Sequence, residues 1–373
     1  MPRPALRLAV ELDGDGAHPA AWRRAAHAPG ELLTPRRVAR VAAAAENAGF
    51  TLVTLDDSIL PPDSGAGPVG RIGAVERAAF VAASTSVVGV APVLATTYAE
   101  PFHVSSQLAS LDHVSAGRAG WVVGVEDDPA AARAWGRPVV EGAGALAREA
   151  HDGLRVVQDL WDSWEDDAVI RSVATSRYLD RKRLHAIDFT GETYSVKGPS
   201  IVPRPPQGRP VVLARPGLVP AGLVDVALVG GATPAETGEA AAAAGAPLAF
   251  AEIEVALDTP HETALERIAD LERYAPWETR PDRLRYTGSA EGLVALLAEL
   301  AAHVDGVRLW PLVLDEDLAV LSRLVLPELF VRRLAARPLP GTTLRTSLGL
   351  PRPAGRFATG TGTAAALVRE ETR

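Results

Sequence analysis

Short apolar runs alternate with helical patterns along most of this chain, and this alternation restricts its fold more than any other feature. Eight runs have the length and composition of buried strands. They cover residues 6–12, 50–55, 86–93, 120–125, 211–214, 224–229, 248–257 and 307–309. The clearest helix is 35–48, because Thr34 and Pro35 form a typical helix start and Gly49 a typical end. Strands that alternate with helices in this way form a parallel sheet.

The number of strand and helix units favours a closed (β/α)8 TIM barrel over an open doubly wound sheet. An open dinucleotide-binding sheet would carry a glycine-rich fingerprint after its first strand. The run at 14–16, Gly-Asp-Gly, lacks the third glycine and the helix start. Barrels with insertions often reach 373 residues as one unit, so we predict a single barrel domain over 1–353.

Two segments depart from the barrel pattern. Between 165 and 208 the periodicity fails, with charges clustered at 177–183 and four prolines in 194–207. We therefore predict a surface insertion there. The end of the chain, 354–373, is rich in Gly and Thr and is predicted to be a flexible C-terminal extension.

Composition excludes several classes of function. Acidic residues outnumber basic ones by 46 to 38, so we expect no nucleic-acid partner. The chain has no cysteine, and its histidines form no metal-binding pair with a nearby glutamate, so no metal site is predicted. Redox chemistry would therefore require a bound cofactor. With no signal peptide in 1–10 and no apolar stretch near the ~20 residues of a membrane span, we expect a cytoplasmic protein without membrane contact.

Five stretches together carry a family resemblance. They are HPAAWRR at 18–24, ATTYAEPFHVSSQLASLDHVSAGRAGW at 95–121, LWDSWEDDA at 160–168, FTGETYSVKGPSIVPRPPQGRPVV at 189–212, and LPELFVRRL followed by TTLRTSLGLPRP at 342–353. In order and spacing they resemble the nitrilotriacetate and dibenzothiophene-sulfone monooxygenase branch of the bacterial luciferase-like, flavin-dependent monooxygenases. The likeness extends over nearly the whole chain.

The resemblance implies a function as well as a fold. Proteins of this kind bind reduced FMN supplied by a separate flavin reductase, react it with O2, and insert one oxygen atom into a small organic substrate. Relatives often pair through barrel helices, so a homodimer formed through the helix at 99–115 is an expectation.

Residues that follow predicted strands are the candidates for cofactor binding, because barrel enzymes place their chemistry at the carboxyl ends of the strands. Asp57 falls on the position of an aspartate that helps to place the flavin in similar proteins, and the alternative is a turn cap. Thr96 and Thr97 match a Ser/Thr-rich turn whose hydroxyls bond the flavin, and ordinary turn bonding is the alternative.

The catalytic candidates are His18, Trp22 and His103. His18, Trp22 and Arg23 follow the first strand and would line the substrate entrance, although Trp22 also suits a partly buried surface position. His103 and His113 lie in the helix after the third strand, where an imidazole can shuttle protons. Their distance from the strand end favours structural roles.

The chain departs from the family at positions that contact the flavin. Val122 stands where relatives have an asparagine, and Ala147 aligns with a tyrosine near the flavin phosphate. After the fifth strand, relatives have a Gln-Ala-Gly turn and a helix start that cradle the phosphate. Here the run is Ala-Arg-Pro-Gly at 214–217, which leaves Arg215 and Gly217 as the candidate contacts.

Three functions remain open. A flavin-dependent monooxygenase predicts a deep pocket at the carboxyl ends of the strands. A degenerate paralogue, acting as a non-catalytic partner subunit or small-molecule binder, predicts a filled or shallow pocket. A deazaflavin-dependent enzyme would need a different phosphate site and hydride chemistry. The sequence does not indicate a substrate.

Overall fold

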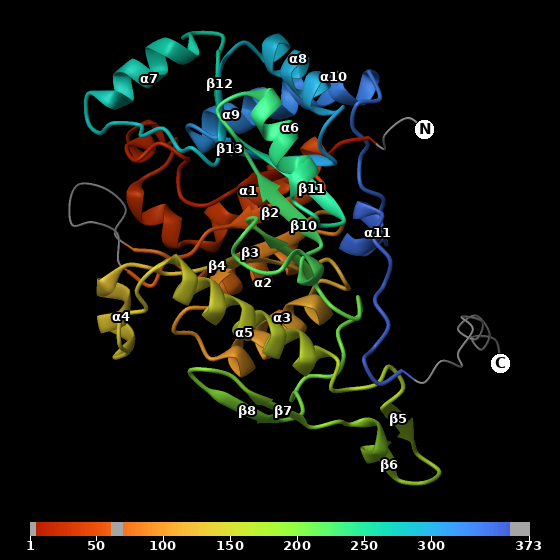
Figure 1. Cartoon of the computed structure of the whole chain (residues 1–373). Helices are drawn as coiled ribbons and strands as arrows, with labels where there is room; N and C mark the ends of the chain where they lie inside the picture. The colour runs from red at the N-terminus through yellow and green to blue at the C-terminus, as the bar shows by residue number, and fades with distance from the viewer. Residues whose placement is uncertain (1–4, 61–69, 359–373) are drawn as a thin grey trace, which may run out of the picture.

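Eight parallel strands close into a barrel in the computed structural model, which describes residues 5–60 and 70–358 (Figure 1). The strands are β1 (Arg7–Glu11), β2 (Leu52–Leu55), β3 (Gly89–Ala95), β4 (Gly120–Gly124), β9 (Val211–Ala214), β10 (Val226–Val229), β11 (Leu248–Leu257) and β13 (Gly306–Pro311). They neighbour one another in this order, and β13 pairs with β1 to close the ring. Each overlaps one of the eight predicted runs, although β3 and β13 extend past the predicted ends, so the predicted barrel is confirmed.

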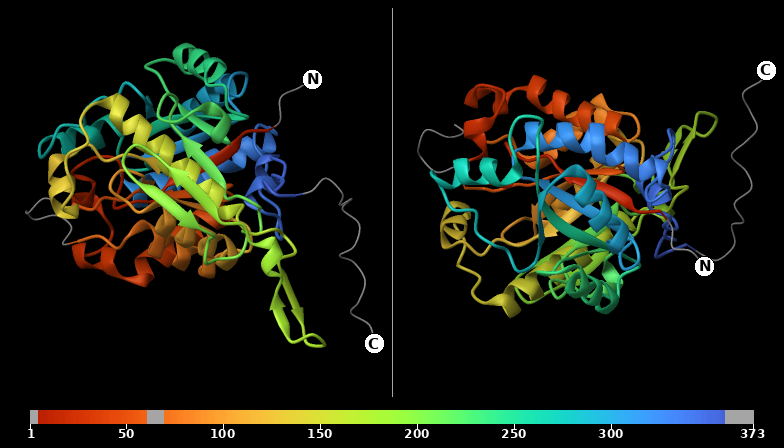
Figure 2. Two further views of the ribbon diagram at one scale, coloured as in Figure 1. Left: turned by 60° about the horizontal axis from the view of Figure 1, so that its bottom comes forward. Right: turned by 90° about the horizontal axis from the view of Figure 1, so that it is seen from above.

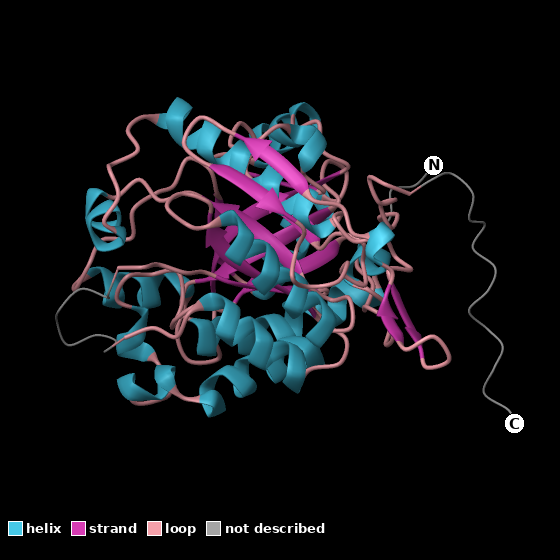
Figure 3. Cartoon of the chain, turned by 90° about the horizontal axis from the view of Figure 1, so that it is seen from below, coloured by secondary structure: helices cyan, strands magenta, loops and turns pink. Residues whose placement is uncertain are grey.

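Helices surround the strands on the outside (Figure 3). They are α1 (Pro35–Ala48), α2 (Ala74–Ser84), α3 (Pro101–Val114), α4 (Pro129–Trp135), α5 (Ala143–Trp161), α6 (Pro234–Ala243), α7 (Ala264–Glu272), α8 (Ala290–Leu300), and a last helix made of α9 (Leu314–Val320), the π-helical turn η5 (Leu321–Val325) and α10 (Leu326–Val331). Between β9 and β10, where every residue is described, the only helical segment is the 3-10 turn η4 (Ala221–Leu223). The barrel therefore lacks the outer helix that would follow its fifth strand.

The amino end of the barrel is closed by a short helix, α11 (Leu344–Leu348). Leu344 and Leu348 are buried in one cluster with inward-facing residues of the strands, including Leu52 and Phe250. A Cβ at Gly89 would lie 2.6 Å from a Leu344 methyl carbon, so the missing side chain lets the plug close. This end of the barrel is an apolar core, which leaves the carboxyl end for chemistry.

Two hairpins occupy the predicted insertion, 165–208, outside the barrel (Figure 2). One pairs β5 (Val169–Ser172) with β6 (Arg177–Leu179), and the other pairs β7 (Ile187–Thr190) with β8 (Ser195–Gly198). Between the hairpins lies the 3-10 turn η3 (Arg181–Arg183). The bounds of the barrel domain stay a prediction.

The start of the predicted C-terminal extension contacts the insertion. The Phe357 ring stacks on His185 at 3.9 Å between centroids, and Arg356 pairs with Asp159 of α5 at 3.1 Å. Residues 359–373, the rest of the predicted extension, lie outside the described residues.

A ninth parallel strand, β12 (Leu284–Gly288), extends the sheet beyond the barrel. The first residues of β11 pair with β10, and its last five residues pair with β12. The loop before β12 passes over the carboxyl end of β10, where a Cβ at Gly230 would lie 2.2 Å from the Asp282 carbonyl oxygen. Residues 275–283 therefore form part of the barrel entrance.

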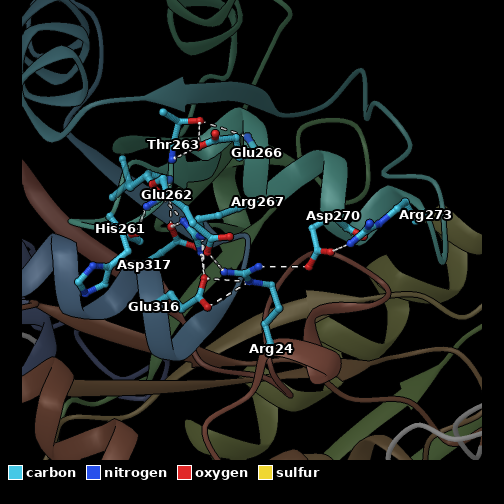
Figure 4. A network of polar contacts seen from close by, with 12 residues as sticks. Arg24, His261, Glu262, Thr263, Glu266, Arg267, Asp270, Arg273, Glu316 and Asp317 are labelled. Atoms are coloured by element: carbon cyan, nitrogen blue, oxygen red, sulfur yellow. Dashed lines mark hydrogen bonds and ion pairs between the residues drawn. The ribbon is translucent and has the colours of Figure 1, made fainter.

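A network of charged residues fixes another part of this entrance (Figure 4). Arg267 of α7 is fully buried and donates hydrogen bonds to Asp317 at 2.7 Å and to Glu316 at 2.6 Å. Arg24, from the 3-10 turn η1 (Ala21–Arg24), donates to Glu316 and to Asp270 at 3.1 Å each. Since buried guanidinium groups need such partners, η1, α7 and α9 are held together around the end of β11.

Candidate active site

A cavity of about 330 Å³ opens at the carboxyl ends of the barrel strands. Its apolar side is formed by Val93 of β3, by Val122 and Val123 of β4, and by Leu228 of β10. The opposite side carries Trp310 of β13 and several arginines. The volume is at the lower end of the range for small-molecule sites, roughly 300–1,000 Å³.

A buried ionic cluster forms the floor of this cavity. Arg308 of β13 donates hydrogen bonds to Thr54 Oγ1 at 2.9 Å, to Glu252 Oε1 at 3.0 Å and to Glu11 Oε2 at 2.5 Å. Burial opposes the charge of Glu11, but Arg308 and the Thr54 hydroxyl hold the pKa of this carboxyl below its ordinary value. Burial likewise opposes the charge of Arg308, but Glu252 and Glu11 raise the pKa of its guanidinium. Glu11 and Arg308 therefore both stay charged at neutral pH.

Trp310 provides a flat wall above this cluster. Its indole N–H donates to Glu252 Oε1 at 3.2 Å. The guanidinium carbons of Arg283 and Arg308 lie 3.5 and 4.3 Å from its ring centroid. Cations over an aromatic face are attracted by the ring quadrupole, so these contacts fix the orientation of the indole.

Ion pairs connect the loop before β12 to the end of β9. Arg215 pairs with Asp282 at 2.7 Å and lies 3.7 Å from Glu252. Arg280 lies 3.5 Å from the same Asp282 carboxylate. Nearby, Arg283 lies 3.4 Å from Glu254 Oε1. Arg215 and Arg280 therefore depend on the same carboxylate, that of Asp282, and Arg283 depends on Glu254.

Asp56 lies directly after β2 and is the acidic residue among those that line the cavity. Its Oδ1 accepts the backbone N–H of Asp57 at 2.9 Å. Burial and the negative charges of Glu11 and Asp13 raise the pKa of Asp56 to about 6. This side chain therefore changes charge close to neutral pH.

Of the residues predicted to bind flavin, Val122 and Arg215 line the cavity. Asp57 instead accepts the backbone N–H of Ala74 at 2.8 Å, at the start of α2, and that of Ser58 at 2.9 Å. This is the capping alternative. Gly217 has a φ of +83°, and a Cβ added there would have no atom of the described residues within 4 Å.

Both predicted threonines use their hydroxyls to bond the backbone at the end of β4 and just after it. Thr96 Oγ1 donates to the carbonyl of Gly124 at 3.2 Å, and its side chain packs against Gly153 of α5. Thr97 Oγ1 accepts the backbone N–H of Glu126 at 3.1 Å. A role of either threonine in flavin binding stays a prediction.

The catalytic candidates lie apart from the residues that line the cavity. His18 is buried beside Trp277, its Nδ1 accepts the Ala20 N–H at 3.0 Å, and burial lowers the pKa of its imidazole. Trp22 is half-buried on η1, with the Arg23 guanidinium 4.9 Å from its ring.

His103 is exposed on α3, on the outside of the barrel. His113 is exposed on the same helix and faces the Pro203 carbonyl oxygen at 3.4 Å. Their roles in catalysis stay predictions.

Sequence reasoning missed most of the charged residues of the site. Asp56, Arg283, Arg308 and Trp310 line the cavity, and Glu252 contacts both Arg308 and Trp310. A signal was present in the strands: AEIEV in β11 and VRLWP in β13 place charged residues at inward positions of otherwise apolar segments. Charges buried in a strand need partners, so such a pattern indicates an ionic cluster inside the barrel.

In the part of the chain that the structure describes, neither a cluster of metal ligands nor a membrane-spanning helix is found. Within 5–60 and 70–358, no three histidine, aspartate or glutamate side chains gather closely enough to hold a metal ion. No helix in the same residues combines the length and the hydropathy that a membrane span requires.

Comparison with known proteins gives consistent matches. A family model described as luciferase-like monooxygenase matches residues 17–275. The chain is 36% identical over 211 residues to N-acetyl-S-(2-succino)cysteine monooxygenase of Bacillus subtilis (strain 168), covering 56% of this chain and 47% of that protein. It is 34% identical over 214 residues to dibenzothiophene-sulfone monooxygenase of Rhodococcus erythropolis, covering 54% and 47%. The chain thus matches about half the length of these relatives.

A solved structure shows the same fold. The crystal structure of a long-chain alkane monooxygenase superposes with a TM-score of 0.80, covering 94% of this chain and 96% of that one, at 20% sequence identity. At this identity the likeness concerns the barrel and not its chemistry.

Proposed function

The chain belongs to the luciferase-like monooxygenase family, and we propose that it is a monooxygenase that uses reduced FMN. A separate flavin reductase would supply the flavin, and one atom of O2 would enter a small organic substrate. The observation that carries this proposal is the cavity at the carboxyl ends of the strands, the place where barrel enzymes perform their chemistry.

The residues of the cavity fit parts of the flavin. Val93, Val122 and Leu228 offer the apolar surface that a flat ring system requires. Arg215 offers a cation for the phosphate, provided that its pair with Asp282 opens. When bound, reduced flavin supplies the reaction with O2, and the chain supplies the binding site and excludes water.

A non-catalytic binder is the second candidate, because one part of the phosphate site is missing. The barrel has no outer helix among the residues between β9 and β10, all of which are described. A helix start there would have offered backbone N–H groups and a favourable dipole to the phosphate. With the helix gone, this part of the site depends on side chains such as Arg215.

The first experiment is an anaerobic titration of the full chain with oxidised and with chemically reduced FMN. We expect saturable binding of reduced FMN. Arg215→Ala should weaken it roughly ten- to hundredfold, because a hydrogen bond to a charged group contributes about 1.5–3 kcal/mol. Absence of binding in the wild-type chain would reject the monooxygenase and favour the non-catalytic binder.

Asp282→Asn is the matched control for Arg215→Ala, since both variants break the same ion pair. If Arg215 holds the phosphate, Asp282→Asn frees the guanidinium and leaves FMN affinity unchanged or higher. If Arg215 only anchors the loop before β12, both variants weaken binding equally, and the phosphate role of Arg215 is wrong.

Oxygen reactivity separates the two candidate functions once binding is established. A monooxygenase should change the rate at which bound reduced FMN is reoxidised by O2, relative to free reduced FMN. Reoxidation at the rate of free flavin would favour the non-catalytic binder. The measurement is a stopped-flow absorbance trace of the complex mixed with aerated buffer.

A further inference from the structure

Guanidinium groups dominate the polar lining of the cavity. Arg215, Arg280, Arg283 and Arg308 line it, and Asp56 is the acidic residue among the lining residues. Arg308 is neutralised by the two buried glutamates of the floor. Of the three other arginines, Arg215 and Arg280 are about half-exposed, whereas Arg283 is buried.

Arg283 is the most deeply buried of the three, and its carboxylate contacts are long. Its closest carboxylate oxygens, from Glu254 and Glu252, lie 3.4 and 3.9 Å away. Glu254 is shared with Arg285, which approaches it at 2.7 Å. The Arg283 side chain is only 7% exposed, yet its Nε finds no hydrogen-bond partner in the described residues. A buried donor without an acceptor is costly, so this site is built to receive one.

Its surroundings increase this need for an anion. Burial lowers the pKa of Arg283, Glu252 opposes the effect, and the positive charges of Arg280, Arg308 and Arg215 lower it further. Besides these three arginines, the carboxylates of Glu252, Glu254 and the neighbouring Asp282 lie close to Arg283. An anionic ligand would offset the repulsion among the guanidinium groups.

The geometry also defines how an anion would be held. Arg283 lies on the Trp310 ring at 3.5 Å, which fixes the plane of its guanidinium. The edge of this group donates one long hydrogen bond, to Glu254 at 3.4 Å, which a planar two-oxygen group would replace. Arg280 is 49% exposed, and its closest carboxylate is 3.5 Å away, so it is free to turn towards a ligand. Leu218 and Val125, which also line the cavity, would contact an apolar body.

We propose that this cavity binds a small organic anion, with a carboxylate held by Arg283 and Arg280 and an apolar body packed against Leu218 and Val125. The inference rests on the proposed function in one respect: it makes this carboxylate compound the substrate class of the monooxygenase. The geometry of the binding site itself does not depend on the flavin.

Benzoate and its neutral isostere benzamide are the probes that test the proposal. Each is titrated into the full chain while binding is followed by calorimetry and tryptophan fluorescence. We expect saturable binding of benzoate and at least roughly tenfold weaker binding of benzamide, because the charge-assisted hydrogen bonds are lost. Equal binding of the two compounds would overturn the proposal.

Variants locate the carboxylate. Arg283→Met and Arg280→Gln should each weaken benzoate binding roughly tenfold or more, with benzamide binding unchanged, and Arg283→Lys should recover part of the affinity. Arg332→Gln, at an exposed pair with Glu328 on α10, is the control and should bind as the wild type does. Arg280 is half-exposed, so its variant tests the site even if Arg283→Met unfolds. Wild-type affinity in both cavity variants would overturn the assignment.

A titration of benzoate in saturating reduced FMN separates this proposal from the proposed function. Unchanged or tighter benzoate binding supports the substrate assignment. Competition between the two ligands would show that Arg283 serves the flavin, and would overturn that assignment. If reduced FMN binds and benzoate does not, the inference fails and the monooxygenase stands. If benzoate binds and FMN does not, the anion site stands and the monooxygenase fails.

Discussion

Replacing Arg308 with methionine should destabilise the protein strongly, because it leaves Glu11 and Glu252 buried without their shared cation. All three side chains are at most 4% exposed. Removing one partner of such a buried cluster costs about 3–5 kcal/mol. The unfolding entropy of about 2.1 cal/mol/K per residue gives about 0.8 kcal/mol/K for 373 residues, so the melting temperature should fall by roughly 4–6 °C.

The loss should depend on pH in a defined direction. In the wild-type chain the pKa of Glu11 is held below its unfolded value, so its contribution is present at neutral pH and is lost only in acid. Without Arg308, burial outweighs the remaining hydrogen bonds from Thr54 and the Asp56 backbone and raises the folded pKa of Glu11 above the unfolded one. The variant then regains stability as pH falls, because the folded state binds the extra proton. The difference in melting temperature between the wild type and Arg308→Met should therefore be smaller at pH 5 than at pH 7.

Thermal unfolding followed by circular dichroism at pH 7 and pH 5 tests this prediction. Arg332→Gln is again the control, since its exposed pair on a helix contributes about 0.3–0.5 kcal/mol, which is less than about 1 °C. Adding Glu252→Gln to Arg308→Met should restore part of the loss, because one buried charge disappears. A melting temperature within about 1 °C of the wild type at pH 7 would refute the reasoning, as would a difference that widens in acid.

Three further predictions concern residues around the cavity and the plug. Asp57→Ala should lower the melting temperature by about 1–3 °C through loss of its hydrogen bond to the start of α2, and unchanged affinity for reduced FMN would identify Asp57 as a cap only. Asp56→Asn should be more stable than the wild type above pH 6 and not below pH 4, because the folded pKa of Asp56 is about 6 and the unfolded value about 3.9, as thermal unfolding from pH 4 to 8 will show. Gly89→Ala should destabilise the barrel, since its Cβ would meet Leu344 at 2.6 Å, and Leu344→Ala in the same chain should relieve that contact but leave a cavity, so that a chemical denaturation series shows non-additive losses.

The sequence predicted the barrel because its strands are buried on both faces and appear as apolar runs. The helix at 35–48 was predicted with both bounds, since a capping threonine, a proline and a glycine mark its ends. The strand β12 was missed because it is buried only at Leu284 and otherwise mixes polar and apolar residues. The hairpins of the insertion were missed for the same reason, as most of their residues are exposed. Exposed strands lack the run of apolar residues from which a buried strand can be predicted.

The site was harder to predict because its contacts join distant parts of the chain. Arg308 and Glu11 are separated by 297 positions and meet only because β13 closes the barrel against β1. Arg215 was predicted from the resemblance as a phosphate contact, and it does line the cavity. Its partner Asp282 lies in a loop before β12, a strand that the sequence did not reveal. The sequence therefore indicated which residues could line the site, but not which residues they would pair with.

The missing helix after β9 and the arginines of the cavity are connected by electrostatics. A helix start offers fixed partial charges that need no counter-ion, whereas guanidinium side chains are full charges that must be paired when no ligand is bound. Asp282 meets this need for Arg215 at 2.7 Å, while the closest carboxylates of Arg280 and Arg283 are 3.5 and 3.4 Å away. Binding of an anion in this cavity is therefore an exchange of counter-ions, in which a ligand oxygen replaces or joins an aspartate at the entrance. The affinity of such a site depends on how easily those pairs open as much as on the new contacts, which is why Asp282→Asn and Arg215→Ala must be measured together.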